Sequence, residues 1–205
     1  MKRLVVATRN KGKIVEISAL LSGLVEQICS AADFVGFPET VEDGATFEEN
    51  ALKKAREAVR FSALPALADD SGLVVDVLDG RPGVYSARYA GVGAGDAANN
   101  ARLVEEIADI PAEQRQAAFI CVLAYVTPDG DERLFSGRVE GKIITKARGD
   151  GGFGYDPFFL VDGLEQSMAE LTLAEKNSLS HRAQAFRKFR EYLAESHKET
   201  MPCEE

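Results

Sequence analysis

The stretch Ala68-Asp69-Asp70-Ser71-Gly72 sets two adjacent carboxylates between two apolar runs. Two charges at the mouth of a buried strand are costly unless a cation compensates them. Mg²⁺ is the usual cation where all the ligands are oxygens, and the small Ser71 and Gly72 leave room for a phosphate. The alternative is a plain hairpin turn, because Asp, Ser and Gly are common turn residues. The stretch therefore predicts an acidic turn, with the metal site and the simple turn both open.

Strand and helix patterns alternate on both sides of this acidic turn. Apolar runs predict strands at 4–7, 25–29, 67, 73–78, 117–127 and 133–144. Helical spacing or capping-box sequences predict helices at 13–21, 46–61, 96–108 and 180–195, with another capping box at 172–175. Pro128-Asp129-Gly130 predicts a hairpin between the two long strands. This alternation, followed by a long hairpin, favours an α/β fold with a mixed sheet.

The size and charge of the chain argue against several classes of protein. Its 205 residues suffice for one two-lobed domain, which we assign to 1–196, followed by a polar, frayed tail at 197–205. The 33 acidic and 24 basic residues give a net charge of −9, which argues against nucleic-acid and membrane-surface partners. The longest apolar run, 117–126, is too short to span a bilayer. A small phosphorylated ligand in a local basic pocket remains compatible with this charge.

The cysteines are spaced in a way that disfavours a disulfide framework or a zinc site. The three residues, Cys29, Cys121 and Cys203, are far apart and form no CxxC pair. Cys29 and Cys121 lie in apolar runs, where buried free thiols are expected. This usage predicts a reducing compartment, the cytoplasm.

A basic loop follows the first predicted strand and opens the first helix. It reads Ala7-Thr8-Arg9-Asn10-Lys11-Gly12-Lys13. Backbone N–H groups at a helix start attract phosphate, and three nearby cations strengthen that attraction. The loop lacks the GxxxxGK[ST] pattern of a Walker A sequence. Phosphate binding and an ordinary strand–helix loop with solvated lysines are the two interpretations.

Three further segments carry groups suited to ligand binding. Gly151-Gly152-Phe153-Gly154-Tyr155-Asp156-Pro157 permits close backbone approach, and an aromatic ring there could stack on a base; the alternative is a flexible loop with core aromatics. His181 and Arg182 follow Ser180 at a predicted helix start, near Lys176, and can donate hydrogen bonds to a ligand or lie on the surface. Glu42 is a candidate metal carboxylate in a loop.

Taken together, these segments resemble the inosine triphosphate pyrophosphatase family, also called the Ham1-like family. The resemblance spans Leu4 to about Leu193, with Arg9 and Ala183 standing where the family more often has glycine. The matching segments, in the family's order, are Ala7-Thr8-Arg9-Asn10-Lys11-Gly12-Lys13, Thr46-Phe47-Glu48-Glu49-Asn50-Ala51, Ala68-Asp69-Asp70-Ser71-Gly72-Leu73, Pro82-Gly83-Val84-Tyr85-Ser86-Ala87-Arg88-Tyr89, Gly152-Phe153-Gly154-Tyr155-Asp156-Pro157-Phe158 and Ser180-His181-Arg182.

The resemblance implies an elongated mixed sheet with flanking helices that form two lobes around a central nucleotide cleft. It also implies a homodimer that hydrolyses ITP, dITP and XTP to the monophosphate and pyrophosphate, with Mg²⁺ required. Asp70 is then the catalytic base and a metal ligand, with Glu42 as the second metal ligand. The substrate-binding residues are then Thr8, Arg9, Asn10, Lys11, Gly12, Lys13, Ser71, Phe153, Gly154, Tyr155, Asp156, Lys176, His181 and Arg182.

Two other functions stay open from the sequence. One is a related pyrophosphatase that acts on modified pyrimidine triphosphates. The other is a non-catalytic nucleotide sensor, although a protein that only binds a triphosphate has no need of a general base. Selectivity for hypoxanthine or xanthine over adenine would come from donors that face O6, because the 6-amino group of adenine would place a donor against a donor.

Overall fold

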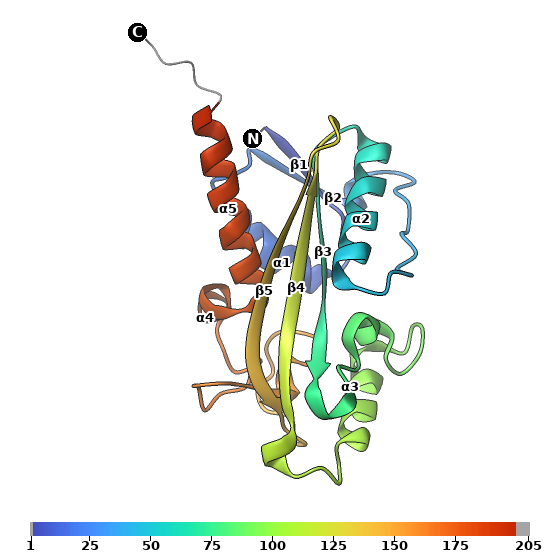
Figure 1. Cartoon of the computed structure of the whole chain (residues 1–205), viewed down its shortest axis with the longest axis vertical. Helices are drawn as coiled ribbons and strands as arrows, with labels where there is room; N and C mark the ends of the chain where they lie inside the picture. Colours follow the sequence, from blue (N-terminus) through green and yellow to red (C-terminus); the bar gives the residue numbers. More distant parts are fainter. Residues whose placement is uncertain (1, 200–205) are drawn as a thin grey trace.

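The structure of the chain is a computed structural model that describes residues 2–199. Its strands form one six-stranded sheet in the order β2-β1-β3-β4-β5-β6 (Figure 1). β1 pairs in parallel with β2 and β3, and the remaining pairs are antiparallel, so the predicted mixed sheet is confirmed. The strands are β1 (Arg3–Val6), β2 (Gln27–Ser30), β3 (Ala66–Val75), β4 (Gln116–Val126), β5 (Glu132–Ile143) and β6 (Phe159–Val161).

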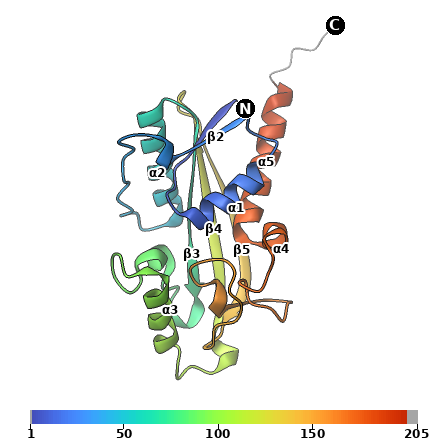
Figure 2. The ribbon, with the colours of Figure 1, turned by 180° about the vertical axis from the view of Figure 1, so that it is seen from behind.

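Long strands β3, β4 and β5 run through both lobes, and helices cover them (Figures 1 and 2). One lobe holds β1, β2, α1, α2 and α5, and the other holds α3 and β6. None of the helices within residues 2–199 has the length and hydropathy of a membrane span. The helices are α1 (Lys11–Leu21), α2 (Phe47–Ser62), α3 (Gly95–Glu106), α4 (Leu173–Leu179) and α5 (His181–Glu199).

The core of the first lobe lies on both faces of the sheet. Side chains of α1 and α5, such as Ile17 and Phe186, pack with Leu67 and Leu123 on one face. Alanines of α2 pack with Ala68 and with Val122, Ala124 and Val126 of β4 on the other face. Small alanines let α2 approach the sheet closely, and burial of this kind contributes about 25 cal/mol per Å² of apolar surface. The second lobe has its own core, built on Leu73, Phe119, Phe159 and their neighbours.

The prediction of an acidic turn between two short strands was wrong. β3 runs without interruption through this stretch, and Asp69 and Asp70 pair with Leu123 and Val122 of β4. Successive side chains of a strand point to opposite faces, so the two carboxylates are separated by the sheet. Each carboxylate then meets cations on its own face of the sheet. These cations offset the cost of burying two adjacent carboxylates in a strand.

Other differences lie at element ends. Thr46 caps α2 as predicted, but the Glu49 carboxylate accepts from Ala45 N at 2.6 Å instead of closing the box on Thr46. The box of Thr172 and Glu175 is complete. The three-residue β6 was missed, because so short a run carries no periodicity. α5 continues to Glu199, past the predicted start of a frayed tail at 197, and residues 200–205 lie outside the described residues.

The end of β1 exposes one edge of β3. β1 pairs with β3 only at Ala66 and Leu67, and the chain then turns away into the basic loop. Within residues 2–199, no strand pairs with this edge at 69–72. Side chains on the two faces of β3 can therefore meet one ligand around the open edge.

Candidate active site

A cavity of about 660 Å³ opens at this edge, between the two lobes. Its walls come from the basic loop, the loop at 37–42, β3, the segment 84–88, the loop at 153–156 and the start of α5. Fourteen of the residues proposed from the sequence line it: Thr8, Arg9, Asn10, Lys13, Glu42, Asp70, Ser71, Phe153, Gly154, Tyr155, Asp156, Lys176, His181 and Arg182. Segments far apart in sequence thus converge on one cleft.

Lys11 and Gly12 do not line the cavity. Lys11 is exposed at the first position of α1. Gly12 lies against the ring of Phe153, and a Cβ at Gly12 would come within 2.5 Å of Phe153 Cδ1. Gly12 therefore supports the aromatic wall of the cleft, and only a glycine leaves room for that ring.

The basic loop is ordered by its own polar side chains. Asn10 is the N-cap of α1, and its Oδ1 accepts from Lys13 N at 3.0 Å. Thr8 Oγ1 accepts from Asn10 N at 3.2 Å. Arg9 Nη2 donates to Phe37 O at 2.6 Å and ties the loop to the neighbouring wall of the cleft. This arrangement fixes the N-terminus of α1 at the cavity, where its dipole favours an anion.

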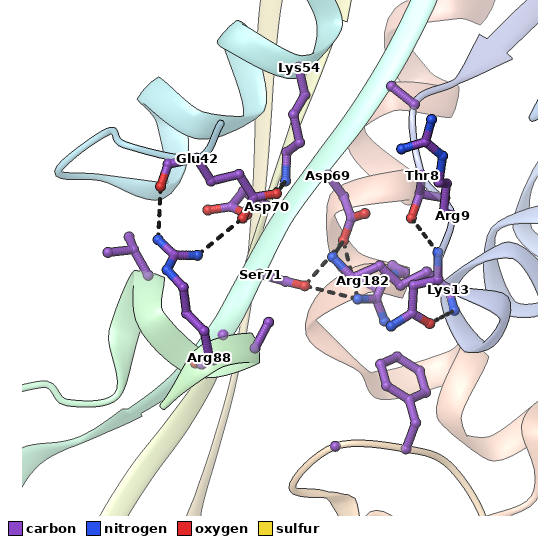
Figure 3. Close-up of a pocket in the computed structure, with 18 of the residues that line it drawn as sticks. Thr8, Arg9, Lys13, Glu42, Lys54, Asp69, Asp70, Ser71, Arg88 and Arg182 are labelled. Atoms are coloured by element: carbon purple, nitrogen blue, oxygen red, sulfur yellow. Dashed lines mark hydrogen bonds and ion pairs between the residues drawn. The ribbon is translucent and has the colours of Figure 1, made fainter. Parts of the chain in front are cut away.

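Asp69 lies on the face of β3 that α1 and α5 cover (Figure 3). Its Oδ2 lies 2.9 Å from Lys13 Nζ and 3.2 Å from Arg182 Nη2, and accepts from Ser71 Oγ at 3.1 Å. Burial alone would raise the pKa of Asp69, but the charges of Lys13 and Arg182 outweigh burial and hold the pKa below its usual range. Asp69 is therefore a fixed anion. It orients two cations and is no candidate for proton transfer.

A chain of buried ion pairs leads from Asp69 to the loop at 153–156, which we call the aromatic loop. Arg182 Nη1 contacts Glu16 Oε2 at 2.5 Å, and Glu16 Oε1 contacts Lys176 Nζ at 2.7 Å. Lys176 Nζ also lies 2.9 Å from Asp156 Oδ2. Burial disfavours the charged form of Lys176, but Asp156 and Glu16 outweigh it and raise its pKa. Both cations proposed for the ligand are thus held in fixed positions by carboxylates.

Asp70 lies on the opposite face of β3, against α2 (Figure 3). Lys54 Nζ lies 2.8 Å from Asp70 Oδ1 and 2.8 Å from Glu42 Oε1, so one ammonium joins both carboxylates. Asn50 Nδ2 donates to Asp70 Oδ2 at 3.3 Å. Burial raises the pKa of Asp70, and Lys54 offsets only part of that increase. A carboxyl with a raised pKa, open to the cleft, is suited to accept a proton.

The donors around Asp70 fit a magnesium ion. Asp70 and Glu42 bring two carboxylates to one place, and all their donor atoms are oxygens. Mg²⁺ is commonly held by one or two carboxylates, with phosphate and water oxygens completing its shell. Within residues 2–199, no group of three or more His, Cys, Asp or Glu side chains forms a metal cluster. The chain would therefore supply Asp70 and Glu42, and a phosphorylated ligand and water the rest.

Phe153 and His181 form the far end of the cleft. The ring centroid of Phe153 lies 5.4 Å from Lys176 Nζ and 5.7 Å from Arg182 Cζ, while its edge rests on Gly12. His181 stacks on Phe119, with centroids 5.0 Å apart. Burial and the charge of Arg182 lower the pKa of His181 well below its usual value, so the imidazole is neutral at pH 7. This region combines an apolar surface with a few fixed donors, as a base-binding pocket requires.

Sequence reasoning missed Glu16, Asn50 and Lys54 as residues of the site. Asn50 and Lys54 are four apart on α2, next to its buried alanines, and Glu16 is three residues after Lys13 on α1. Polar residues that share a helix face with core residues are a usable signal for a buried polar site. The sequence alone does not reveal that Asn50 and Lys54 meet Asp70, or that Glu16 meets Lys176 and Arg182.

A model of the Ham1 family matches residues 4–192 of the chain. The chain belongs to the Ham1 family. The matched range includes the basic loop, β3, the aromatic loop and the start of α5. The fold predicted from the resemblance, two lobes around an elongated mixed sheet, is therefore confirmed.

Several members of the Ham1 family are close to this chain over nearly their whole length. A dITP/XTP pyrophosphatase of Geobacter sulfurreducens is 56% identical over 193 residues, covering 94% of this chain and 97% of the relative. One of Exiguobacterium sibiricum is 50% identical, covering 91% and 94%. The solved Ham1 protein of Coxiella burnetii is 40% identical and superposes with a TM-score of 0.85, covering 95% and 100%. That of Staphylococcus aureus is 36% identical with a TM-score of 0.84, again covering 95% and 100%.

Proposed function

We propose that this protein hydrolyses the triphosphates of altered purines, ITP, dITP and XTP, to the monophosphate and pyrophosphate. The observation that carries the proposal is the pairing of Asp70 and Glu42 at one Lys54, across the open edge of β3 from Lys13 at the start of α1. The side with Lys13 offers cations and a helix N-terminus for the phosphates, and the side with Asp70 offers a general base. The names of the relatives, dITP/XTP pyrophosphatase, support the same reaction.

In this proposal, the phosphates lie against the basic loop, where Lys13 and the N-terminus of α1 neutralise their charge. Asp70 orients a water molecule and takes its proton as the water attacks phosphorus, while the anhydride bond between the α and β phosphates breaks and pyrophosphate separates from the monophosphate. Asp70 and Glu42 would also hold Mg²⁺, which when bound would stabilise charge that develops on the phosphate oxygens. Positioning and charge neutralisation supply most of the catalysis, as is usual for phosphoryl transfer.

The nucleobase of the substrate lies against Phe153, within reach of Lys176, His181 and Arg182. Cationic donors fit O6 of hypoxanthine or xanthine. The adenine amino group would leave those donors unpaired, a mismatch that can cost on the order of 10⁴-fold.

The proposal includes three further properties of the protein. Activity requires Mg²⁺, the protein is a homodimer, and it works in the cytoplasm. The oxygen donors of Asp70 and Glu42 support the metal, and the resemblance to the family supports the dimer. Cys29 and Cys121 are buried free thiols, which supports a reducing compartment. Light scattering on the purified chain tests the dimer, and titration of Mg²⁺ into protein freed of metal with a chelator tests the metal.

The identity of the products tests the reaction. Purified protein is incubated with ITP and Mg²⁺, and the products are separated by ion-exchange chromatography. We expect IMP and pyrophosphate in equal amounts. IDP and phosphate would contradict the proposal, and preferential cleavage of modified pyrimidine triphosphates would favour the related pyrimidine activity.

A further inference from the structure

Gly154, in the aromatic loop, is held through both of its backbone groups by one turn of α3. Gly154 N donates to Asp96 Oδ2 at 2.7 Å, and Gly154 O accepts from Asn100 Nδ2 at 2.9 Å. Asp96 and Asn100 are four residues apart on a helix, so they point in the same direction. Gly154 has a φ of +62°, which glycine adopts without cost. The two side chains form what we call the Gly154 clamp.

The Gly154 clamp lies next to Phe153, the aromatic wall on which we expect the nucleobase to stack. Phe153 precedes Gly154, and its N–H donates to Asp156 Oδ2 at 2.9 Å. Tyr155 follows, and its hydroxyl donates to Ser86 O at 2.8 Å. Every residue of 153–156 thus has a partner, and Gly154, which has no side chain, depends on α3 for its own. Asp96 and Asn100 therefore hold the residue that follows Phe153, while Asp156 holds the N–H of Phe153 itself.

The environments of the two clamp residues differ. Asn100 is buried, and a buried amide is costly unless it is hydrogen-bonded. Asp96 is exposed in the first turn of α3, where the helix dipole favours a carboxylate. Within residues 2–199, no hydrogen bond or ion pair joins Asp96 or Asn100 to Asp70, Glu42 or the basic loop, although Asp96 lines the same cavity. The clamp is therefore separate from the phosphate end of the cleft.

We propose that Asp96 and Asn100 are positioning residues that fix the Phe153 wall before the base binds. The inference rests on the proposed function, because it takes the base to stack on Phe153. A loop with glycines at 151, 152 and 154 would otherwise sample many conformations, and ordering it on binding would weaken affinity. The clamp removes that cost in advance. Loss of the clamp should raise KM for ITP more than it lowers kcat, because Asp70 stays in place.

Steady-state kinetics on ITP test this role. Asp96→Ala and Asn100→Ala are each expected to raise KM about ten-fold, the effect of losing one good hydrogen bond, with kcat within about two-fold of wild type. Asp96→Asn keeps an oxygen acceptor for Gly154 N and should restore most of the loss. Glu105→Gln removes an exposed carboxylate elsewhere on α3 and serves as the matched control. A fall in kcat at unchanged KM, or Asp96→Asn as impaired as Asp96→Ala, would overturn the proposal.

A second measurement needs no nucleotide. The chain has no tryptophan, so Phe153→Trp introduces a single fluorescent reporter at the wall. Adding Asp96→Ala should lower the fluorescence anisotropy of that tryptophan, while adding Glu105→Gln should not. Unchanged anisotropy with Asp96→Ala would contradict the clamp. If the anisotropy falls but the wild-type protein leaves ITP intact, the clamp stands and the proposed function fails.

Discussion

Asp69 and Asp70 are consecutive residues of β3 whose carboxylates lie on opposite faces of the sheet, 2.9 Å from Lys13 and 2.8 Å from Lys54 respectively. Burial would raise the pKa of both. Lys13 and Arg182 reverse that effect at Asp69, whereas Lys54 offsets only part of it at Asp70. One carboxylate is therefore a fixed part of the scaffold, and its neighbour is available for proton transfer.

Substitution of the two aspartates should separate these roles. Asp70→Asn keeps the shape but removes the proposed base, so we expect kcat on ITP to fall at least about 100-fold with the fold intact. Asp69→Asn leaves the buried Arg182 and the partly exposed Lys13 short of a partner and should lower the free energy of unfolding by about 3 kcal/mol. Steady-state kinetics and urea unfolding measure the two effects. Near-normal turnover of Asp70→Asn would rule out the assigned base.

Asp70 should also leave a signature in the pH dependence of stability. Its pKa is raised above 3.8 in the folded state, so ionisation of Asp70 opposes folding. Well below pH 3.8 the group is protonated in both states, and Asp70→Asn should then match wild type. As pH rises through the folded pKa, wild type loses stability relative to the variant, so Asp70→Asn should have the higher Tm at pH 8. In a chain of this size, about 1 kcal/mol corresponds to roughly 2–4 °C. A variant with a lower Tm at pH 8 would contradict the raised pKa.

Lys13 should matter for the triphosphate in a way that other lysines near the N-terminus do not. It lies at the start of α1 and lines the cavity, whereas Lys2 is exposed before β1. Lys13→Ala should reduce kcat/KM for ITP at least ten-fold, because side chain and helix dipole act on the same anion. Lys2→Ala is the matched control. Equal, small effects of both substitutions would argue against a phosphate site at this helix.

Arg182 should affect which nucleobase the protein accepts. Its terminal nitrogens are held by Glu16, Asp69 and Ser71, and its buried Nε has no hydrogen-bond partner within the described residues. If Arg182 donates to O6, Arg182→Ala should lower kcat/KM for ITP about ten-fold or more and leave the much lower value for ATP nearly unchanged. Unfolding curves control for lost ion pairs. An equal loss on both nucleotides would show that Arg182 serves the scaffold.

Local patterns in the sequence were enough to predict most of the elements. The capping-box pattern at Thr46 predicted α2, and the turn at Pro128-Asp129-Gly130 predicted the β4–β5 hairpin. The capping box noted at Thr172 stands at the start of α4. These signals are local, because a cap or a turn depends on residues a few positions apart. The candidate site residues were predicted mainly through the resemblance to a family, and their roles stay predictions.

The continuity of β3 could not be predicted from local sequence. Two adjacent aspartates disfavour a strand unless each meets a cation, and those cations come from Lys13, Lys54 and Arg182 on three other elements. Lys13 is 56 positions and Arg182 113 positions away from Asp69, so the compensation is purely tertiary. The Gly154 clamp is likewise tertiary, because its acceptor Asp96 and its donor Asn100 both lie on α3.

The selectivity of pyrophosphate release tests the central claim most directly. Release is measured with Mg²⁺ on ITP, XTP, GTP and ATP at equal concentrations, with a chelator as control. We predict kcat/KM for ITP and XTP at least about 100-fold above that for ATP, with activity abolished by the chelator. Equal rates on ITP and ATP, or no pyrophosphate from any of them, would contradict the proposed function.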